Sequence, residues 1–374
     1  MATKSSTAAN VDDARAAALS KFIARTSKSD PGAMFTFNGA ALDVPVIPTG
    51  ALSLDYALGV GGLPRGRIVE CYGPESSGKT SLALSVAAQA IKAGGMAGIV
   101  DAEHAINPDH IKSMGVDPDY FAITQPSSGE EGLRSLESMI NEKIFDVLIV
   151  DSVAGLVPES ELRGEIGDSF VGTQARLMSQ TLRKLTGPIA ESQAVVIFIN
   201  QLREKIGVLY GNPETTPGGK ALKFYASVRL DVRSIASLTP KDRDGKTNIG
   251  VGTRVTVVKN KVAPPQKKAE YNLIWGKGID AASSVFDVAR DLGVLLEQSG
   301  NSYANALTAE VLADSDGKVI RGKQNVKDFL AANKEVAAQL EAACRLQMRA
   351  TAEPIDAEGP IPDEVFEDAE EAIA

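Results

Sequence analysis

The sequence is poor in cysteine, in long apolar runs and in net positive charge. Its two cysteines, Cys71 and Cys344, cannot build a disulfide framework. No apolar stretch approaches the ~18 residues that would indicate a membrane span. The first residues include Asp12 and Asp13 and lack the apolar segment of a secretory signal. Together these absences predict a protein of the reducing cytoplasm.

The formal net charge of −9 argues at first against a nucleic-acid partner, because a surface that binds nucleic acid should be basic. The position of the acidic residues removes this objection. Nine of the 48 acidic residues lie in residues 353–374, which contain no Lys or Arg, so the rest of the chain holds 39 charged residues of each sign. Because positive and negative charges balance in residues 1–352, a nucleic-acid partner is still possible, provided that the basic surface is local.

Strand and helix patterns alternate through the middle of the chain, which predicts an α/β fold. Near-continuous apolar runs at Phe145–Val150 and Ala194–Ile199 are typical of parallel strands that are covered on both faces. Later strands follow one another without long helices between them and predict an antiparallel extension, so the sheet should be mixed and mostly parallel. These later strands are expected at Tyr225–Val232, Thr253–Lys259 and Glu270–Trp275.

Composition and pattern divide the chain into four segments. Residues 1–40 hold a helix at 12–26 and a short strand at Ala33–Phe37, which cannot bury their apolar faces alone. Residues 41–277 form the α/β core. Residues 278–350 predict a small α-rich domain, and residues 351–374 a disordered acidic tail.

The segment Gly73–Thr80, GPESSGKT, matches the phosphate-binding loop known as Walker A, with an apolar strand before it and a helix after it. Its glycines let backbone N–H groups converge on phosphate oxygens, and the helix N-terminus adds its dipole. We expect Lys79 to reach the β- and γ-phosphates and the Thr80 hydroxyl to bind Mg²⁺. An ordinary glycine-rich turn is the alternative. The predicted nucleotide-binding residues here are Gly73, Pro74, Glu75, Ser76, Ser77, Gly78, Lys79, Thr80 and Ser81.

Polar residues also stand at the ends of other predicted strands. Asp151 ends the strand DVLIVD, where an α/β sheet binds ligands, and is the Walker B candidate that holds Mg²⁺ through water. Glu103 follows another strand and can act as the base for the attacking water. Gln201 follows a third strand, where its amide can contact a γ-phosphate. A weaker alternative is a metal cluster made of Asp101, Glu103, His104 and His110.

With these motifs, the chain resembles the bacterial RecA recombinase family from about Val46 to Gly278, and more weakly in residues 320–350. Beyond the Walker A loop, the motifs that carry the resemblance are VIPTG at 46–50, DAEHA at 101–105, LIVDSV at 148–153, GEIGDS at 164–169, FINQLREKIGV at 198–208, GNPETT at 211–216, ALKFYASVR at 221–229 and VVKNKVAPP at 257–265.

The resemblance implies a RecA-type P-loop ATPase core with ATP and Mg²⁺ as cofactors. It implies a DNA-dependent ATPase that converts ATP to ADP and phosphate, forms helical filaments on single-stranded DNA and promotes strand exchange with homologous duplex DNA. A role in DNA repair and the SOS response, with a LexA-type repressor as partner, is implied too. A ring-forming DNA helicase or motor, which shares this core, is the alternative.

The resemblance also assigns residues to roles. Lys79, Glu103, Asp151 and Gln201 would be catalytic. Lys259 and Lys261 would reach across a subunit interface to a neighbour's ATP, and Phe224 would lie in that interface. The first 40 residues would be the polymerisation element. The two DNA-binding loops would be residues 161–171 and 202–221, with Phe170, Val171, Arg176, Arg203, Lys205, Tyr210 and Lys220 as contact residues.

Physical arguments support the loop and interface roles to different degrees. Lys259 and Lys261 are two residues apart on a predicted strand, so both should point to one face and could meet an anionic phosphate; a solubilising lysine edge is the alternative. The second loop combines cations with glycines and with Tyr210, which can stack on bases. The first loop is not basic, and Arg176 is its better phosphate ligand.

Departures from the family pattern indicate a divergent lineage, such as a phage-encoded one. His110 stands where the family usually has a tyrosine that stacks on adenine, and imidazole offers a smaller stacking area. Gln266 replaces a usual phenylalanine. The acidic tail has two interpretations: it competes with DNA for basic surface and so limits access, or it serves only solubility.

Overall fold

The computed structural model describes residues 15–25, 44–165, 168–170, 172–204, 214–239, 248–306 and 308–350. Backbone contacts divide the chain into two units, Met1–Asp43 and Val44–Ala374. In the first unit, residues 15–25 form a helix on which Leu19 and Phe22 are exposed, in agreement with the predicted helix. The strand predicted at Ala33–Phe37 and the acidic tail lie outside the described residues.

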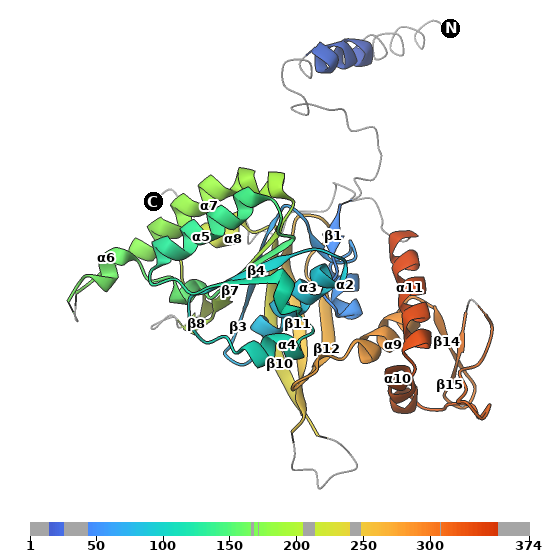
Figure 1. Ribbon diagram of the computed structural model, residues 1–374. Coiled ribbons are helices and arrows are strands. Elements are labelled where there is room, and N and C mark those ends of the chain that lie inside the picture. Colours follow the sequence, from blue (N-terminus) through green and yellow to red (C-terminus); the bar gives the residue numbers. More distant parts are fainter. Residues whose placement is uncertain are drawn as a thin grey trace, which may run out of the picture. The chain divides into compact units, whose positions relative to one another are not determined.

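Among the described residues, nine strands of the second unit form one sheet in the order β13-β12-β11-β10-β3-β7-β6-β4-β5 (Figure 1). The parallel part consists of β3 (Ile68–Gly73), β4 (Ala97–Asp101), β5 (Phe121–Thr124), β6 (Val147–Asp151) and β7 (Val195–Gln201), with β10 (Val228–Leu238) parallel to β3. The antiparallel part adds β11 (Gly250–Asn260), β12 (Lys268–Ile274) and β13 (Gly278–Ile279). The mixed, mostly parallel sheet and its antiparallel extension are therefore as predicted.

The strand register brings the carboxyl ends of the parallel strands to one edge of the sheet. Gly73 at the end of β3 pairs with Gln201 at the end of β7. Asp101 of β4 pairs in the same way with Asp151 of β6. The sequence placed Tyr225 in a strand, but it ends the helix α8 (Ala221–Tyr225), and β10 begins only at Val228.

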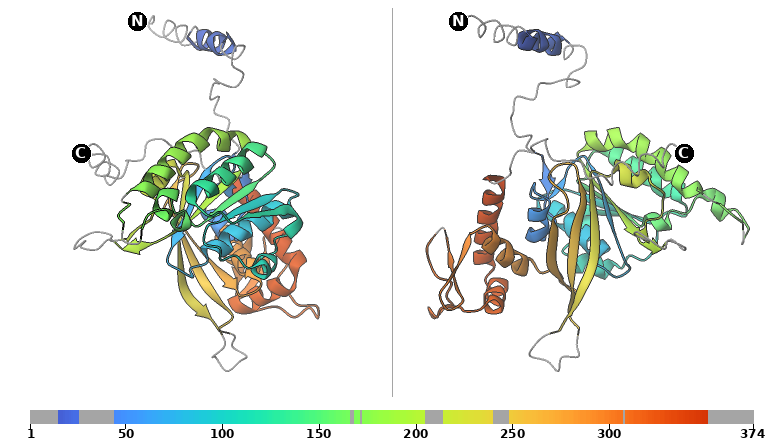
Figure 2. Two further views of the ribbon diagram at one scale, coloured as in Figure 1. Left: turned by 60° about the vertical axis from the view of Figure 1, so that its left-hand side comes forward. Right: turned by 180° about the vertical axis from the view of Figure 1, so that it is seen from behind.

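Helices cover both faces of the sheet because successive strand residues point to opposite sides. In β6, Ile149 packs into a cluster on the side of α3 (Lys79–Lys92), whereas Leu148 and Val150 pack into a second cluster with α5 (Gly129–Glu142) and α7 (Thr173–Ser192). The two latter helices lie side by side on their face (Figure 1 and Figure 2). This double cover explains the near-continuous apolar strands of the sequence.

Local capping signals confirm two predicted helix starts. The Asn107 side chain accepts a hydrogen bond from the Asp109 N–H at 2.8 Å and begins α4 (Pro108–Ser113). The Ser128 hydroxyl accepts from the Glu131 N–H at 3.2 Å and begins α5. The Glu131 carboxylate accepts in turn from the N–H of Ser127, one residue before the expected cap.

Smaller elements connect this framework. They are β1 (Val46–Ile47), α2 (Leu52–Ala57), β2 (Leu63–Pro64), the 3₁₀ helices η1 (Pro118–Tyr120) and η2 (Val153–Gly155), α6 (Glu159–Leu162), β8 (Arg203–Glu204) and β9 (Glu214–Thr215). Within the described residues, no helix has both the length and the apolar character that a membrane crossing requires.

The last part of the described chain has its own apolar cluster, centred on Phe286 and Tyr303, whose rings meet edge to face at 5.1 Å. Three helices, α9 (Ala281–Asp291), α10 (Lys323–Ala332) and α11 (Lys334–Ala350), build it together with a hairpin of β14 (Leu295–Gln298) and β15 (Ser302–Asn305). The helices agree with the predicted α-rich character, and the hairpin is an addition. Contacts place this part in one unit with the core, and the predicted boundary at residue 278 stays a prediction.

A buried ion pair joins α11 to the core. The guanidinium of Arg345 donates to the carboxylate of Asp55 on α2 at 2.9 Å, and Asp55 also accepts from the N–H and hydroxyl of Thr49 at 2.8 and 2.7 Å. The Thr49 carbonyl accepts from the hydroxyl of Ser85 on α3 at 2.9 Å. A continuous hydrogen-bonded chain thus runs from the C-terminal helix to the helix that follows the phosphate-binding loop.

Candidate active site

The segment Gly73–Thr80 forms the loop between β3 and α3, as its sequence predicts. Gly78 caps α3 with a φ of +94°, a backbone conformation that residues other than glycine rarely adopt. A Cβ at Gly73 would lie 2.1 Å from the carbonyl oxygen of Val232, so backbone from β10 approaches the loop too closely for any other residue. The glycines at both ends of the loop are therefore required by geometry.

Donors gather around this loop in the way that a phosphate group needs. The Lys79 ammonium donates to the carbonyls of Gly73 and Pro74 at 3.1 and 2.6 Å, and burial lowers its pKa. The buried hydroxyl of Ser77 has no hydrogen-bond partner among the described residues. A lysine held over the loop, an unsatisfied hydroxyl and the start of a helix fit the phosphates of ATP.

Thr80 and Asp151, the two predicted Mg²⁺ ligands, contact each other. The Thr80 hydroxyl donates to the Asp151 carboxylate at 2.6 Å. Burial, together with the nearby carboxylates of Glu103 and Asp101, raises the pKa of Asp151 to about 6, although the hydrogen bond from Thr80 lowers it. Hydroxyl and carboxylate oxygens suit Mg²⁺, and a divalent cation would offset the cost of the buried negative charge.

Glu103 and Gln201, which the sequence predicted as base and phosphate sensor, are brought into direct contact. The Gln201 amide donates from Nε2 to Oε1 of Glu103 at 2.9 Å. The hydroxyl of Ser152 donates to the same oxygen. Sequence reasoning missed Ser152, although its position directly after the Walker B candidate was a usable signal.

The residues of the alternative metal cluster near Glu103 are hydrogen-bonded to other parts of the chain. Asp101 accepts from the N–H groups of Ala105 and Ile106 and from Gln125, and Nε2 of His104 lies 3.1 Å from the carbonyl of Pro126. Asp101 and His104 thus have structural partners. In the described part of the chain, no group of three or more His, Cys, Asp and Glu side chains is arranged to hold a metal ion.

The chain segments that lead to the two predicted DNA loops leave the same edge of the sheet: the first loop follows β6 after η2 and α6, and the second follows β7 directly. In the first, Phe170 lies close to Gly164, and Arg176 is exposed in the first turn of α7. In the second, Arg203 and Lys220 are exposed near its two ends. The contact residues Val171, Lys205 and Tyr210 lie outside the described residues.

An ion-pair cluster that the sequence did not predict anchors the second loop. Arg233 on β10 donates to both carboxylate oxygens of Glu214 on β9 at 2.8 and 2.6 Å, and also to Asp231. Because β9 pairs with β8, this fork fixes the base of the loop beside the phosphate-binding site.

Lys259 at the end of β11 is held by backbone carbonyls. Its ammonium donates to the carbonyls of Lys223 and Phe224 at 2.6 and 3.2 Å. Burial lowers its pKa to about 8, and the charges of Lys261 and Arg229 add to this effect. Phe224, the predicted interface residue, is 59% exposed. The three predicted interface residues are thus close together.

The structure corrects the predicted direction of Lys261. The sequence placed it on the same strand face as Lys259, but β11 ends at Asn260 and Lys261 follows it. The alternation of a strand therefore does not set the direction of Lys261.

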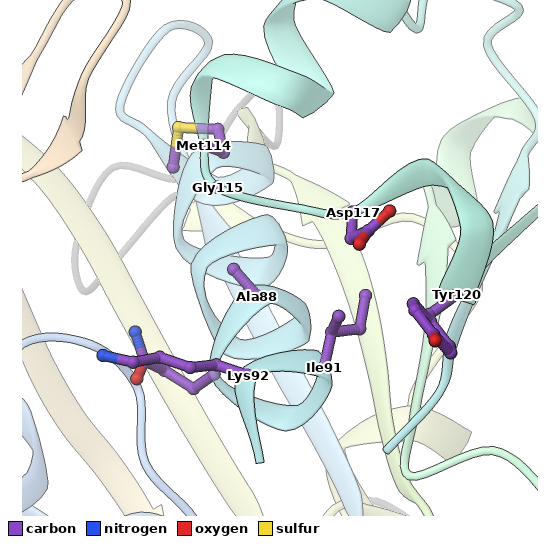
Figure 3. Close-up of a pocket in the computed structure, with 8 residues that line it drawn as sticks. Ala88, Ile91, Lys92, Met114, Gly115, Asp117 and Tyr120 are labelled. Carbon is purple, nitrogen blue, oxygen red and sulfur yellow. The ribbon is translucent and has the colours of Figure 1, made fainter. Parts of the chain in front are cut away.

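A cavity lies away from these residues. It has a volume of about 400 Å³ and sits at the C-terminal end of α3, the opposite end from Lys79 (Figure 3). Its lining consists of Ala88, Gln89, Ile91, Lys92, Met114, Gly115, Asp117 and Tyr120. His110, the predicted adenine contact, is exposed on α4 and is not part of this lining.

Comparisons with known proteins agree with the geometry. The model of the RecA N-terminal domain matches residues 17–280. Protein RecA of Symbiobacterium thermophilum is 52% identical over 315 residues, which cover 84% of this chain and 86% of that protein. Protein RecA of Clostridioides difficile is 48% identical over 338 residues, which cover 90% of this chain and 93% of that protein.

A solved structure of the RadB recombinase matches more weakly, with a TM-score of 0.47 and 22% identity over 63% of this chain and 98% of that one. The family model spans most of the chain, and the sequence relatives match at about half of all aligned positions. The chain belongs to the RecA family.

Proposed function

We propose that this RecA-family protein, a DNA-dependent ATPase of homologous recombination, assembles as a helical filament on single-stranded DNA and hydrolyses ATP between its subunits. In that state it pairs the bound strand with homologous duplex DNA and promotes strand exchange. Single-stranded DNA, duplex DNA and further copies of the chain are its partners. A LexA-type repressor is proposed as a further partner, on the family resemblance alone.

The observation that carries this proposal is the arrangement at the ends of the parallel strands. Thr80, Asp151, Glu103 and Gln201 come from four separate segments and meet at one edge of the sheet through two side-chain hydrogen bonds. Both candidate DNA loops leave from this same edge. A site for hydrolysis that shares its strands with the loops can respond to what the loops bind.

Each side chain has a definite task in this proposal. Lys79 and the N–H groups of the loop bind the ATP phosphates, and Glu103 accepts a proton from the attacking water. Thr80 and Asp151 would hold Mg²⁺, which would supply charge neutralisation at the phosphates. Gln201 contacts the γ-phosphate and so distinguishes ATP from ADP.

The interface residues act in the neighbouring subunit's site. Lys259, together with Lys261, contributes positive charge to ATP held by the next subunit, as an arginine finger does. The exposed Phe224 packs across the same interface. Such a head-to-tail contact joins two different surfaces, so it generates an open helix when it does not close into a ring. Residues 1–40 are proposed to tether neighbouring subunits.

The test is ATP hydrolysis with and without single-stranded DNA and Mg²⁺, with electron microscopy of the same samples. We expect hydrolysis that DNA stimulates and filaments that need ATP. Hydrolysis that is indifferent to DNA would contradict the recombinase, and closed rings with duplex unwinding would identify a ring-forming motor instead.

A further inference from the structure

Ser152 holds the candidate base in a fixed direction. It is 1% exposed, and its hydroxyl donates to Oε1 of Glu103. The same oxygen accepts from the Gln201 amide at 2.9 Å. Two donors occupy both lone pairs of this one oxygen, so Oε1 cannot take a proton from water, and together they fix the orientation of the carboxylate. In the described arrangement this oxygen of Glu103 is therefore restrained rather than available.

The residues after Ser152 are anchored by the far end of the first DNA loop. Gln174 lies in the first turn of α7, directly after that loop. Its side-chain amide donates to the carbonyl of Val153 at 2.8 Å and to the carbonyl of Leu156 at 3.2 Å. A displacement of the start of α7 would therefore move the backbone that carries the Ser152 hydroxyl.

The far end of the second DNA loop packs on the same place. A Cβ added to Gly218 would lie 2.8 Å from Cγ1 of Val153, and one added to Gly219 would lie 2.8 Å from Cβ of Ala175. Both glycines have positive φ, at +84° and +78°. This close approach is possible because neither residue has a side chain. Val153 is thus touched from both loops.

On its other side, the same segment packs against the residues that lead to Glu103. The Ala102 N–H donates to the carbonyl of Asp151 at 2.8 Å. A Cβ at Gly155 would lie 2.7 Å from the carbonyl oxygen of Ala102. Packing this tight transmits a displacement rather than absorbing it. Ser152 therefore stands between both loops and the candidate base.

We propose that Ser152 is a positioning residue that transmits the state of both DNA loops to Glu103. Without DNA, Ser152 and Gln201 restrain Oε1 of Glu103 in a resting direction. DNA bound by the loops shifts Val153 and withdraws the Ser152 hydroxyl. The carboxylate then accepts a proton from the attacking water, the water oxygen bonds to the γ-phosphorus, and the bond between that phosphorus and the β-phosphate oxygen breaks, which gives ADP and phosphate. This inference rests on the proposed function, because it explains how DNA would stimulate hydrolysis.

The test measures ATP turnover of the full-length protein with and without single-stranded DNA for the unmodified chain and for Ser152→Ala. Loss of the restraining hydrogen bond should raise the DNA-independent kcat about fivefold, with the KM for ATP unchanged. The stimulation ratio, defined as kcat with single-stranded DNA divided by kcat without it, should fall by a similar factor. A purely structural role would lower both rates together and would leave their ratio in place.

A second variant tests the same link without touching the site. Gln174→Leu keeps the size of the side chain but removes its amide, which donates to the carbonyls of Val153 and Leu156 beyond Ser152. It should lower the stimulation ratio in the same direction by about twofold. Ser302→Ala is the matched control for Ser152→Ala, since Ser302, at the start of β15 and outside the candidate site, is also a buried serine; its hydroxyl donates to the carbonyl of Ser299. Its stimulation ratio should equal that of the unmodified chain.

The outcomes separate this inference from the function on which it rests. Absence of DNA stimulation in the unmodified chain would overturn both. Normal stimulation in the unmodified chain, with an unchanged ratio in Ser152→Ala and Gln174→Leu, would overturn only the role of Ser152. A fall of both rates in Ser152→Ala at an unchanged melting temperature would also overturn it, because the hydroxyl would then support the active direction of Glu103.

Discussion

Two buried aspartates, Asp151 and Asp55, have similar pKa values but very different partners. Burial is the main cause that raises each pKa to about 6. Asp151 accepts a hydrogen bond from the neutral Thr80 hydroxyl, and a lysine charge is only a smaller contribution. Asp55 accepts from Thr49 and also from the guanidinium of Arg345, which lowers its pKa more than any other neighbour does.

The difference shows that the partners of a buried carboxylate decide whether it contributes to stability or to chemistry. A carboxylate that meets a guanidinium already has its counter-charge and fixes two segments together. A carboxylate that meets only neutral donors keeps its demand for a cation and can exchange partners during a reaction. Asp151 and Glu103 are of the second kind, whereas Asp55 is of the first. Two predictions test this division, a third extends it to a buried cation, and a fourth concerns the acidic residues at the end of the chain.

The largest effect is expected for Glu103→Gln. The amide has the same size as the carboxylate and can still accept hydrogen bonds from Ser152 and Gln201, but it cannot accept a proton from water. Turnover should therefore fall at least ~100-fold. ATP-dependent DNA binding, measured in the same samples by fluorescence anisotropy, should stay largely intact. Turnover within tenfold of the unmodified chain would show that Glu103 is not the base.

Arg345→Ala should act on stability and leave the chemistry alone. It leaves the fully buried Asp55 without its counter-charge, which should cost about 2 kcal/mol of unfolding free energy in a urea titration, since Arg345 is itself partly exposed and water can enter. Turnover per folded molecule should not change. The double variant Asp55→Asn, Arg345→Ala should recover much of the loss, and no recovery would contradict the assigned pairing.

Lys259 extends the comparison to a cation with only neutral partners. With a pKa lowered to about 8, it is charged below that pH and neutral above it, the reverse of a carboxylate. If its charge is needed at the neighbour's phosphate, ATP-dependent assembly should fall up to about tenfold from pH 7 to pH 9, as the charged fraction falls. Light scattering measures assembly. Lys259→Arg, which stays charged, should flatten the profile; an identical profile would exclude this role.

The smallest effect is expected from the acidic residues 353–374, which lie outside the described residues. If they compete with DNA for basic surface, a chain ending at residue 352 should bind duplex DNA a few fold more tightly and depend less on Mg²⁺. A filter-binding titration over several salt concentrations measures both. Unchanged affinity would leave these residues with solubility alone.

Local patterns predicted most of the framework because their causes are local. Alternation between the two faces of a strand, as at Leu148 and Ile149, and the capping side chain of Asn107 act within a few residues. The same reasoning failed at Tyr225, whose β propensity did not prevent it from ending a short helix that packs on α7.

The candidate site was only partly predictable for a related reason. Thr80, Glu103, Asp151 and Gln201 follow from the rule that the carboxyl ends of parallel strands meet at one edge. Which side chains then touch depends on tertiary packing. The pair of Asp55 and Arg345 spans 290 positions of sequence and leaves no local signal. The contact of Ser152 with Glu103 likewise depends on the strand order β6-β4, which the sequence does not state.

The chain of side chains from Arg345 through Asp55 and Thr49 to Ser85 sets a rule for shortening this protein. A version trimmed to the ATPase core would lose α11 and leave the buried Asp55 carboxylate of α2 without a cation, one hydrogen-bonded residue away from the helix that holds Lys79. Such a version should retain residues through Arg345 or carry Asp55→Asn. The length of a minimal ATPase is therefore determined by a single carboxylate near the start of the core.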